Sequence, residues 1–205
     1  MPGSVSGVVG YRRELEGQRP RVLRIGVASL IGGVIGGVLL LVLPDGAFST
    51  IVPVLVGLGI LLVVLQTRIT RWTAARHDAG LAAPRHPVLG AWWVWPAVLL
   101  AGVYGGYFGA AQGVLLMGIM GVGIPETLQR LNALKNVLAA IVNAVAGLLF
   151  AVMADVDWVI VLLIGVGSVI GGQVGATVGR RLPTPVLRGV IVVVGVLALT
   201  VFLLG

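Results

Sequence analysis

The chain has 205 residues, of which 58% are hydrophobic and 10% are charged, against about 25% charged in an ordinary soluble domain. A mean hydropathy of +1.09 excludes a soluble globular protein, and the absence of cysteine excludes disulfides, thiolate nucleophiles and cysteine-bound metal. The net charge of +7 does not indicate nucleic acid as a partner, because the Lys and Arg residues lie between apolar segments, where they orient a membrane protein.

Apolar segments long enough to cross a bilayer core of about 30 Å as helices recur along the chain. In chain order they are residues 25–43, 47–66, 136–154, 158–178 and 186–204. Basic residues follow the second segment and precede the last, and the positive-inside rule places these loops in the cytoplasm. Asp45 and the pair Asp155 and Asp157 mark turns without Lys or Arg, on the opposite side. The sequence therefore predicts a multi-pass membrane protein.

One segment does not fit a single span. Residues 86–125 carry no formal charge, and a straight helix over 92–122 would run about 46 Å, longer than the bilayer core is thick. Glycines crowd its middle: Gly102, Gly105, Gly106, Gly109 and Gly113. We expect a broken element here, a pair of short helices or a re-entrant hairpin that begins and ends on the cytoplasmic side.

The sequence also repeats itself at a constant offset of 139 residues, with the second copy in the opposite topology. Ser29, Gly32, Gly33 and Gly36 match Ser168, Gly171, Gly172 and Gly175. Two inverted repeats are a common transporter architecture. We expect an all-α transmembrane bundle, with residues 1–66 as an incomplete first repeat lacking its initial segment, 67–91 as a cytoplasmic basic loop and 92–205 as the second repeat. The small-xxx-small spacing of Gly32 with Gly36, and of Gly171, Gly175 and Gly179, predicts helix packing.

Three asparagines form a polar stripe in an apolar segment. Asn132, Asn136 and Asn143 fall within about 40° of one another on a helix, with Lys135 on the same flank near the helix start. Free backbone N–H groups and the helix dipole favour an anion there, so the pattern suits a small oxyanion. The alternative is that Lys135 extends to the membrane interface while the asparagines bridge helices.

The glycine-rich break supplies a second group of candidate ligands. A broken helix exposes N–H donors that can coordinate an anion at membrane depth, and small residues allow close approach. Alternatively, the glutamine satisfies the freed backbone in a tightly packed turn. The candidate residues of the break are Gln112, Tyr104, Gly105, Gly106, Gly109 and Gly113.

Catalysis finds no support in the sequence. No nucleophile elbow, metalloprotease helix or phosphate-binding loop motif is present. His77 and His86 are not at metal-ligand spacing, and Asp155 and Asp157 fit a turn better than an acid and base pair. We expect no enzyme, no catalytic residue, no cofactor and no metal.

Long runs of the second half are similar to a known family. GVYGGYFGAAQGVLL at residues 102–116, LNALKNVLAAIVNAVAGLLF at 131–150, and DVDW with SVIGGQVGATVGRRL up to residue 182 resemble the TauE/SafE family of sulfite exporters and organosulfonate permeases. Residues 1–66 resemble the later part of that family's first half. The family's common Gly-Gly-Gly after the break is replaced by Ala111, Gln112 and Gly113.

The resemblance implies a multi-pass transporter of the inner (plasma) membrane, a permease or exporter of small sulfur-containing anions such as sulfite or organosulfonates. Its partners would be that anion and the lipid bilayer, and a homo-oligomer is left open. Lys135 would attract the anion, Asn136 and Asn143 would donate hydrogen bonds, and rocking of the repeats would give alternating access. The alternatives are a non-transporting membrane partner subunit or inactive fragment, and a passive channel.

Overall fold

The computed structural model describes residues 13–78, 90–154 and 156–179, together with positions 186, 189, 192–194, 196–197 and 199–200. Over these residues the secondary structure is helical, without a strand, so the all-α expectation is confirmed. The elements are η1 (Arg13–Leu15), α2 (Arg19–Val42), α3 (Asp45–Asp78), α4 (Val94–Tyr107), α5 (Gln112–Gly123), α6 (Leu128–Met153) and α7 (Trp158–Gly179). Apart from isolated positions, the expected span 186–204 lies outside the described residues.

The helix starts follow local chemistry. Pro20 lies in the first turn of α2, where its missing N–H costs no intrahelical bond. Thr127 caps α6, with its hydroxyl oxygen accepting from the Arg130 backbone N–H at 3.4 Å. Asp157 caps α7, because its carboxylate accepts from the backbone N–H groups of Val159 at 2.9 Å and Ile160 at 3.2 Å. The acidic turn that the sequence marks before residue 158 is thus a helix cap.

Within the described residues, α2 and α6 are long and apolar enough to cross a membrane. Shorter apolar helical stretches cover Thr50–Leu65, Val94–Tyr107, Gln112–Gly123 and Trp158–Ser168. Helix α3 continues to Asp78, so residues 67–78 of the expected basic loop are helical. This stretch contains neither Gly nor Pro, and the loss of hydrophobicity after residue 66 does not by itself end a helix.

The expected break is present as a hairpin between α4 and α5. It spans residues 108–111, where Gly109 has a φ of +80° and Ala111 a φ of +58°. The Ala91 N–H donates to the Gly123 carbonyl at 2.8 Å, so the two outer ends of the hairpin lie together. At 14 and 12 residues, the two helices are about 21 and 18 Å long, each shorter than a bilayer core.

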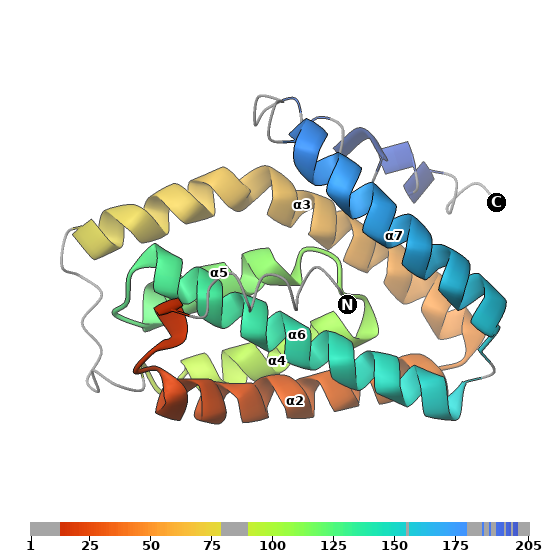
Figure 1. The fold of residues 1–205 in the computed structure, drawn as a ribbon, viewed down its shortest axis with the longest axis horizontal. Coiled ribbons are helices and arrows are strands. Elements are labelled where there is room, and N and C mark those ends of the chain that lie inside the picture. Colours follow the sequence, from red (N-terminus) through yellow and green to blue (C-terminus); the bar gives the residue numbers. More distant parts are fainter. Residues whose placement is uncertain are drawn as a thin grey trace.

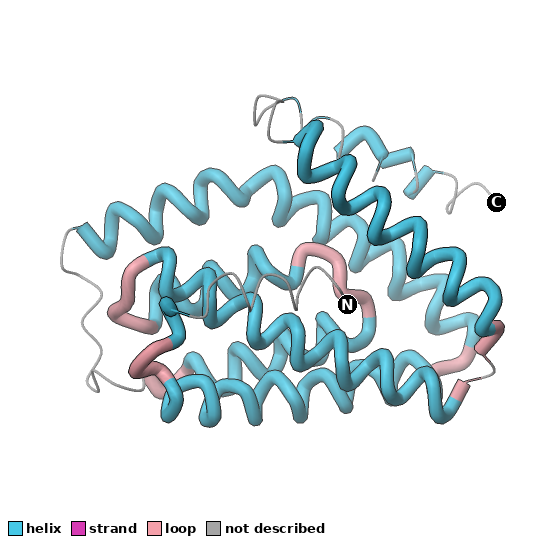
Figure 2. The backbone as a smooth tube through the Cα atoms, in the orientation of Figure 1, coloured by secondary structure: helices cyan, strands magenta, loops and turns pink. Residues whose placement is uncertain are grey.

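Helices α2, α4, α5 and α6 form a bundle around a continuous apolar core (Figure 1). Helix α2 packs on both α4 and α6, and α5 packs against α3, α4 and α6. Figure 2 shows the short loops between α4 and α5 and between α5 and α6, with the starts of α2, α4 and α6 at the left end. The largest fully buried core side chains are Ile25, Leu116, Met120, Ile124, Leu131, Leu134 and Leu138.

Glycines allow α2 and α4 to approach closely. The Cα of Gly32 faces the Leu99 carbonyl, and that of Gly36 faces the Val103 carbonyl, so that a Cβ at either position would overlap the α4 backbone. On the other side of the contact, Gly106 faces the Gly33 carbonyl in the same way. The packing role predicted for Gly32 and Gly36 is therefore confirmed.

Helix α7 lies at the outside of the bundle and runs obliquely from the lower right to the upper left of the view, whereas α2 runs from left to right along the bottom (Figure 1). Its described side chains, from Trp158 to Ile170, are exposed and almost all apolar, as suits a lipid-facing helix. A Cβ added at Gly171 would meet no described atom within 4 Å, unlike one at its repeat counterpart Gly32, and the contacts of Gly175 and Gly179 lie outside the description. The inverted-repeat relation stays a prediction.

Candidate functional site

A cavity of about 310 Å³ lies between α3, α5 and α6. It is within the size range of small-molecule sites. Its lining combines a few polar groups with apolar walls, the usual composition of a ligand pocket. The lining residues are Ile69 from α3, Ala111 from the break, Gly113, Val114 and Met117 from α5, and Asn132 and Lys135 from α6.

Lys135 is the charged residue of this cavity. It is half-buried, two turns into α6, and its stem passes the start of α5. A Cβ at Gly113 would lie 3.3 Å from Lys135 Cδ, so the glycine provides the room for the lysine stem. Asn132, one turn earlier on the same side of α6, adds an amide that can donate hydrogen bonds. The lysine and the amide share one cavity, as the polar stripe predicts.

The start of α5 adds to the positive character of the cavity. Ala111 is its N-cap residue and supplies no side-chain hydrogen bond to the first turn. The Val114 and Leu115 N–H groups donate to the Ala111 carbonyl at 2.9 and 3.5 Å, so the donors left over in the first turn are the N–H groups of Gln112 and Gly113. The helix dipole places about half a positive charge there. An ammonium group and free amide donors at one cavity favour a small anion over a cation.

The left-handed backbone at Ala111 is the strained point of the site. An L-residue with a Cβ in this region costs about 1 kcal/mol relative to glycine. Ala111→Gly should therefore raise the melting temperature of the purified protein, by a few degrees for a chain of this size. Ala110→Gly in the same turn, where no left-handed backbone is present, should not raise it. Equal melting temperatures for Ala111→Gly and the parent would contradict the strain.

Two other predicted site residues, on α6, do not line the cavity. Asn136 is half-buried and Asn143 is exposed, and neither belongs to the described cavity wall. Their role toward an anion stays a prediction. The helix period places them on the stripe of Asn132, about one and three turns further along α6.

Gln112 occupies the interior of the hairpin. Its side chain is only 5% exposed, and its Nε2 has no hydrogen-bond partner among the described residues. The amide lies directly against Gly105, where a Cβ would overlap it. The alternative was that Gln112 satisfies the freed backbone, but its Nε2 makes no hydrogen bond to the backbone of any described residue.

The remaining predicted residues of the break form its turn or pack against neighbouring helices. Gly109 adopts the left-handed conformation of the turn, and Gly106 lies in the α2 contact. Tyr104 lines a separate apolar cavity with residues of α2 and α3, and its buried hydroxyl has no partner among the described residues.

Across the described part of the chain, no group of three His, Asp or Glu side chains is placed to hold a metal ion.

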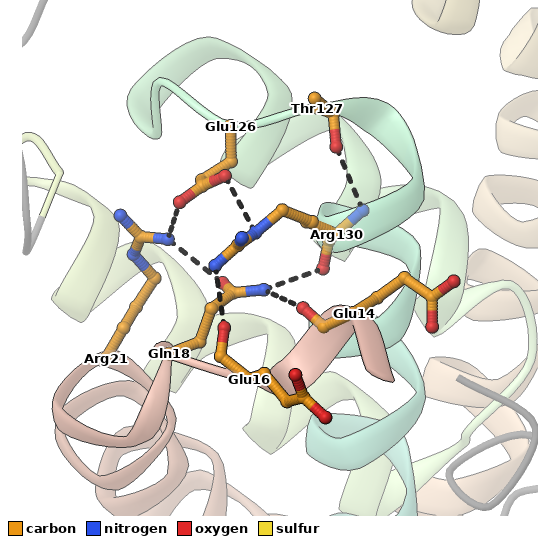
Figure 3. A network of polar contacts seen from close by, with 7 residues as sticks. All are labelled: Glu14, Glu16, Gln18, Arg21, Glu126, Thr127 and Arg130. Carbon is orange, nitrogen blue, oxygen red and sulfur yellow. Dashed lines mark hydrogen bonds and ion pairs between the residues drawn. The ribbon is translucent and has the colours of Figure 1, made fainter. Parts of the chain in front are cut away.

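A polar network at the end of the bundle near the start of α2 was not predicted (Figure 3). Arg21 Nη1 lies 2.8 Å from Glu126 Oε1, and Arg130 Nε lies 3.0 Å from Glu126 Oε2. Gln18, which is 1% exposed, accepts from Arg21 at 2.9 Å and donates to the Glu14 carbonyl at 2.8 Å. The network joins the starts of α2 and α6, the helix that carries Lys135.

One contact of this network could have been predicted from the sequence. Glu126 precedes Arg130 by four residues, the spacing at which opposite charges meet near a helix start. The pairing with Arg21, across 105 positions of sequence, has no such local signal.

The chain was compared with known protein families, curated proteins and solved structures. The model of the family described as sulfite exporter TauE/SafE matches residues 1–202. No curated protein and no solved structure matches the chain significantly. The family match covers every helix that lines the cavity.

Proposed function

The chain belongs to the sulfite exporter TauE/SafE family, a family of membrane transporters, and from this premise we propose that it carries sulfite or an organosulfonate across the inner membrane. The observation that carries the proposal is the cavity between α3, α5 and α6, where Lys135 meets the start of α5. A sulfur oxyanion would accept hydrogen bonds from the ammonium group, the Asn132 amide and the first N–H groups of α5.

Lys135 offsets the charge of the anion in a medium where an unpaired charge is costly. Its long stem lets the ammonium group follow the anion over a short distance, which suits a transient site. Asn136 and Asn143, further along α6, would offer amide donors on the path away from Asn132. Relative motion of the two halves around the hairpin would open the site alternately to either side.

The test is the exchange of labelled sulfite in proteoliposomes containing the purified protein. Lys135→Gln keeps a polar side chain but removes the charge, so we expect about a ten- to hundredfold slower exchange, as when one charged hydrogen bond is lost. Arg71→Gln provides the matched control, because Arg71 is an exposed cation on α3 outside the cavity wall. Saturation and counter-transport would distinguish a carrier from a channel.

Equal exchange rates for Lys135→Gln and the parent, at equal amounts of reconstituted protein, would remove Lys135 from the mechanism. No exchange of sulfite or methanesulfonate by the parent would contradict the proposed function itself.

A further inference from the structure

A second cavity adjoins the one that holds Lys135. It has a volume of about 210 Å³ and lies between α3 and the hairpin turn. Ala111 lines both cavities, so the two meet at the break. No polar or charged side chain contributes to the described wall of the second cavity. Its lining residues are Val56, Gly59, Ile60, Val63, Phe108, Ala110 and Ala111.

The two cavities follow one another along α3. Val63 lines the apolar cavity and Ile69 the cavity of Lys135, a separation of about 9 Å on a helix. The Phe108 ring forms one wall and is held edge-on to the Tyr104 ring, with 6.0 Å between the ring centroids. A molecule lying along α3 would thus meet a cation at one end and only apolar side chains at the other.

We propose that the transported anion carries an apolar group, that this group occupies the cavity at Phe108, and that the missing side chain at Gly59 determines the size of group accepted. The inference rests on the proposed function and narrows its substrate from small sulfur anions in general to those with a hydrocarbon portion. Bare sulfite would use the Lys135 cavity alone and leave the second cavity without a ligand contact.

Burial of hydrocarbon in the second cavity should strengthen binding by a predictable amount. Each methylene group moved from water into an apolar site strengthens binding about three- to fourfold. The affinity for a series of linear alkanesulfonates should therefore rise at each step from methanesulfonate to butanesulfonate, and stop rising once the cavity is full.

Gly59 offers a direct way to close the apolar cavity. A Cβ added there would lie 3.7 Å from Tyr104 Oη and 3.9 Å from Ala110 Cβ and Phe108 Cε1, which is ordinary contact. The further carbons of a leucine would extend into the cavity. At Gly57, two residues earlier on α3, an added Cβ would meet no described atom within 4 Å, so Gly57→Leu is the matched control.

The experiment measures binding of sulfite, methanesulfonate, butanesulfonate and hexanesulfonate to the full chain in lipid nanodiscs by titration calorimetry. For the parent and Gly57→Leu we expect butanesulfonate to bind at least tenfold more tightly than methanesulfonate. For Gly59→Leu we expect this gain to be lost while methanesulfonate binding is unchanged. Gly59→Ala, which adds only one methyl group, should reduce the gain partially and keeps the test valid if the leucine variant does not fold.

An affinity that is independent of chain length in the parent would overturn the inference, as would an equal gain in Gly59→Ala and the parent. Neither result bears on the proposed function, which is tested separately by whether the parent exchanges sulfite or methanesulfonate. Conversely, a chain-length gain that Gly59→Leu abolishes, in a protein without any exchange, would support the two-part site and contradict transport.

Discussion

Gly36→Ala is expected to prevent α2 and α4 from packing, and with it the assembly of the bundle. The added Cβ would overlap the Val103 carbonyl, a backbone atom that cannot turn aside as a side chain can. The helices would have to separate along their whole contact, where Gly32 and Gly106 make equally close approaches. Overpacking of this kind commonly costs about 1–3 kcal/mol, and a rigid backbone partner places this substitution at or above the upper end.

The measurement is the yield of monodisperse protein after mild detergent extraction, together with its melting temperature. Gly26→Ala is the control on the same helix, because its Cβ would meet only the flexible end of the Ile141 side chain, at 3.3 Å. We expect a near-complete loss of folded protein for Gly36→Ala and parent-like behaviour for Gly26→Ala. Parent-like yield and stability for both would show that the glycine contact is looser than described.

Glu126→Gln is expected to destabilise the protein by about 3 kcal/mol, which for a chain of this length lowers the melting temperature by on the order of 10 °C. Glu126 pairs with Arg21, whose side chain is 5% exposed, and with Arg130. A neutral amide would remove the negative charge that lies 2.8 Å from Arg21 and 3.0 Å from Arg130. The large effect comes from removing one member of a buried ion pair, since an intact buried pair contributes little net stability but breaking it is costly.

Glu16→Gln is the matched control for this prediction. Only the backbone carbonyl of Glu16 takes part in the network, accepting from Arg130 Nη2 at 3.1 Å, so its carboxylate can be neutralised without breaking a described contact (Figure 3). Thermal unfolding in detergent compares the two variants directly. Equal melting temperatures for Glu126→Gln and Glu16→Gln would show that the network contributes no more to stability than an exposed ion pair does.

The break was predictable from the sequence because two independent features agree on it. The uncharged segment is too long for one span, and its glycines crowd the middle, where the structure has the turn at Gly109 and Ala111. The end of α3 was not predictable in the same way. Hydropathy indicates where a helix emerges from the membrane, but not where the helix itself ends. Between residue 66 and Asp78 there is no Gly or Pro that would end α3.

The candidate site was predictable only in part. Helical periodicity places Asn132 and Asn143 on one face, but it does not say which helix faces each of them. The structure puts Asn132 with Lys135 in the cavity and leaves Asn143 exposed. The α3 residues of both cavities, such as Ile69 and Gly59, belong to an apolar helix whose pattern gives no sign of which side chains meet the break.

The hairpin also determines how the chain enters the bilayer. Neither α4 nor α5 is long enough to span the hydrocarbon, and the backbone groups released at Phe108–Ala111 cannot face acyl chains. Neither half can therefore leave the translocon sideways on its own, as an ordinary span does. The hairpin must pass into the lipid as one unit against the glycine face of α2, which is synthesised earlier, so biogenesis of this segment depends on a partner helix already in place.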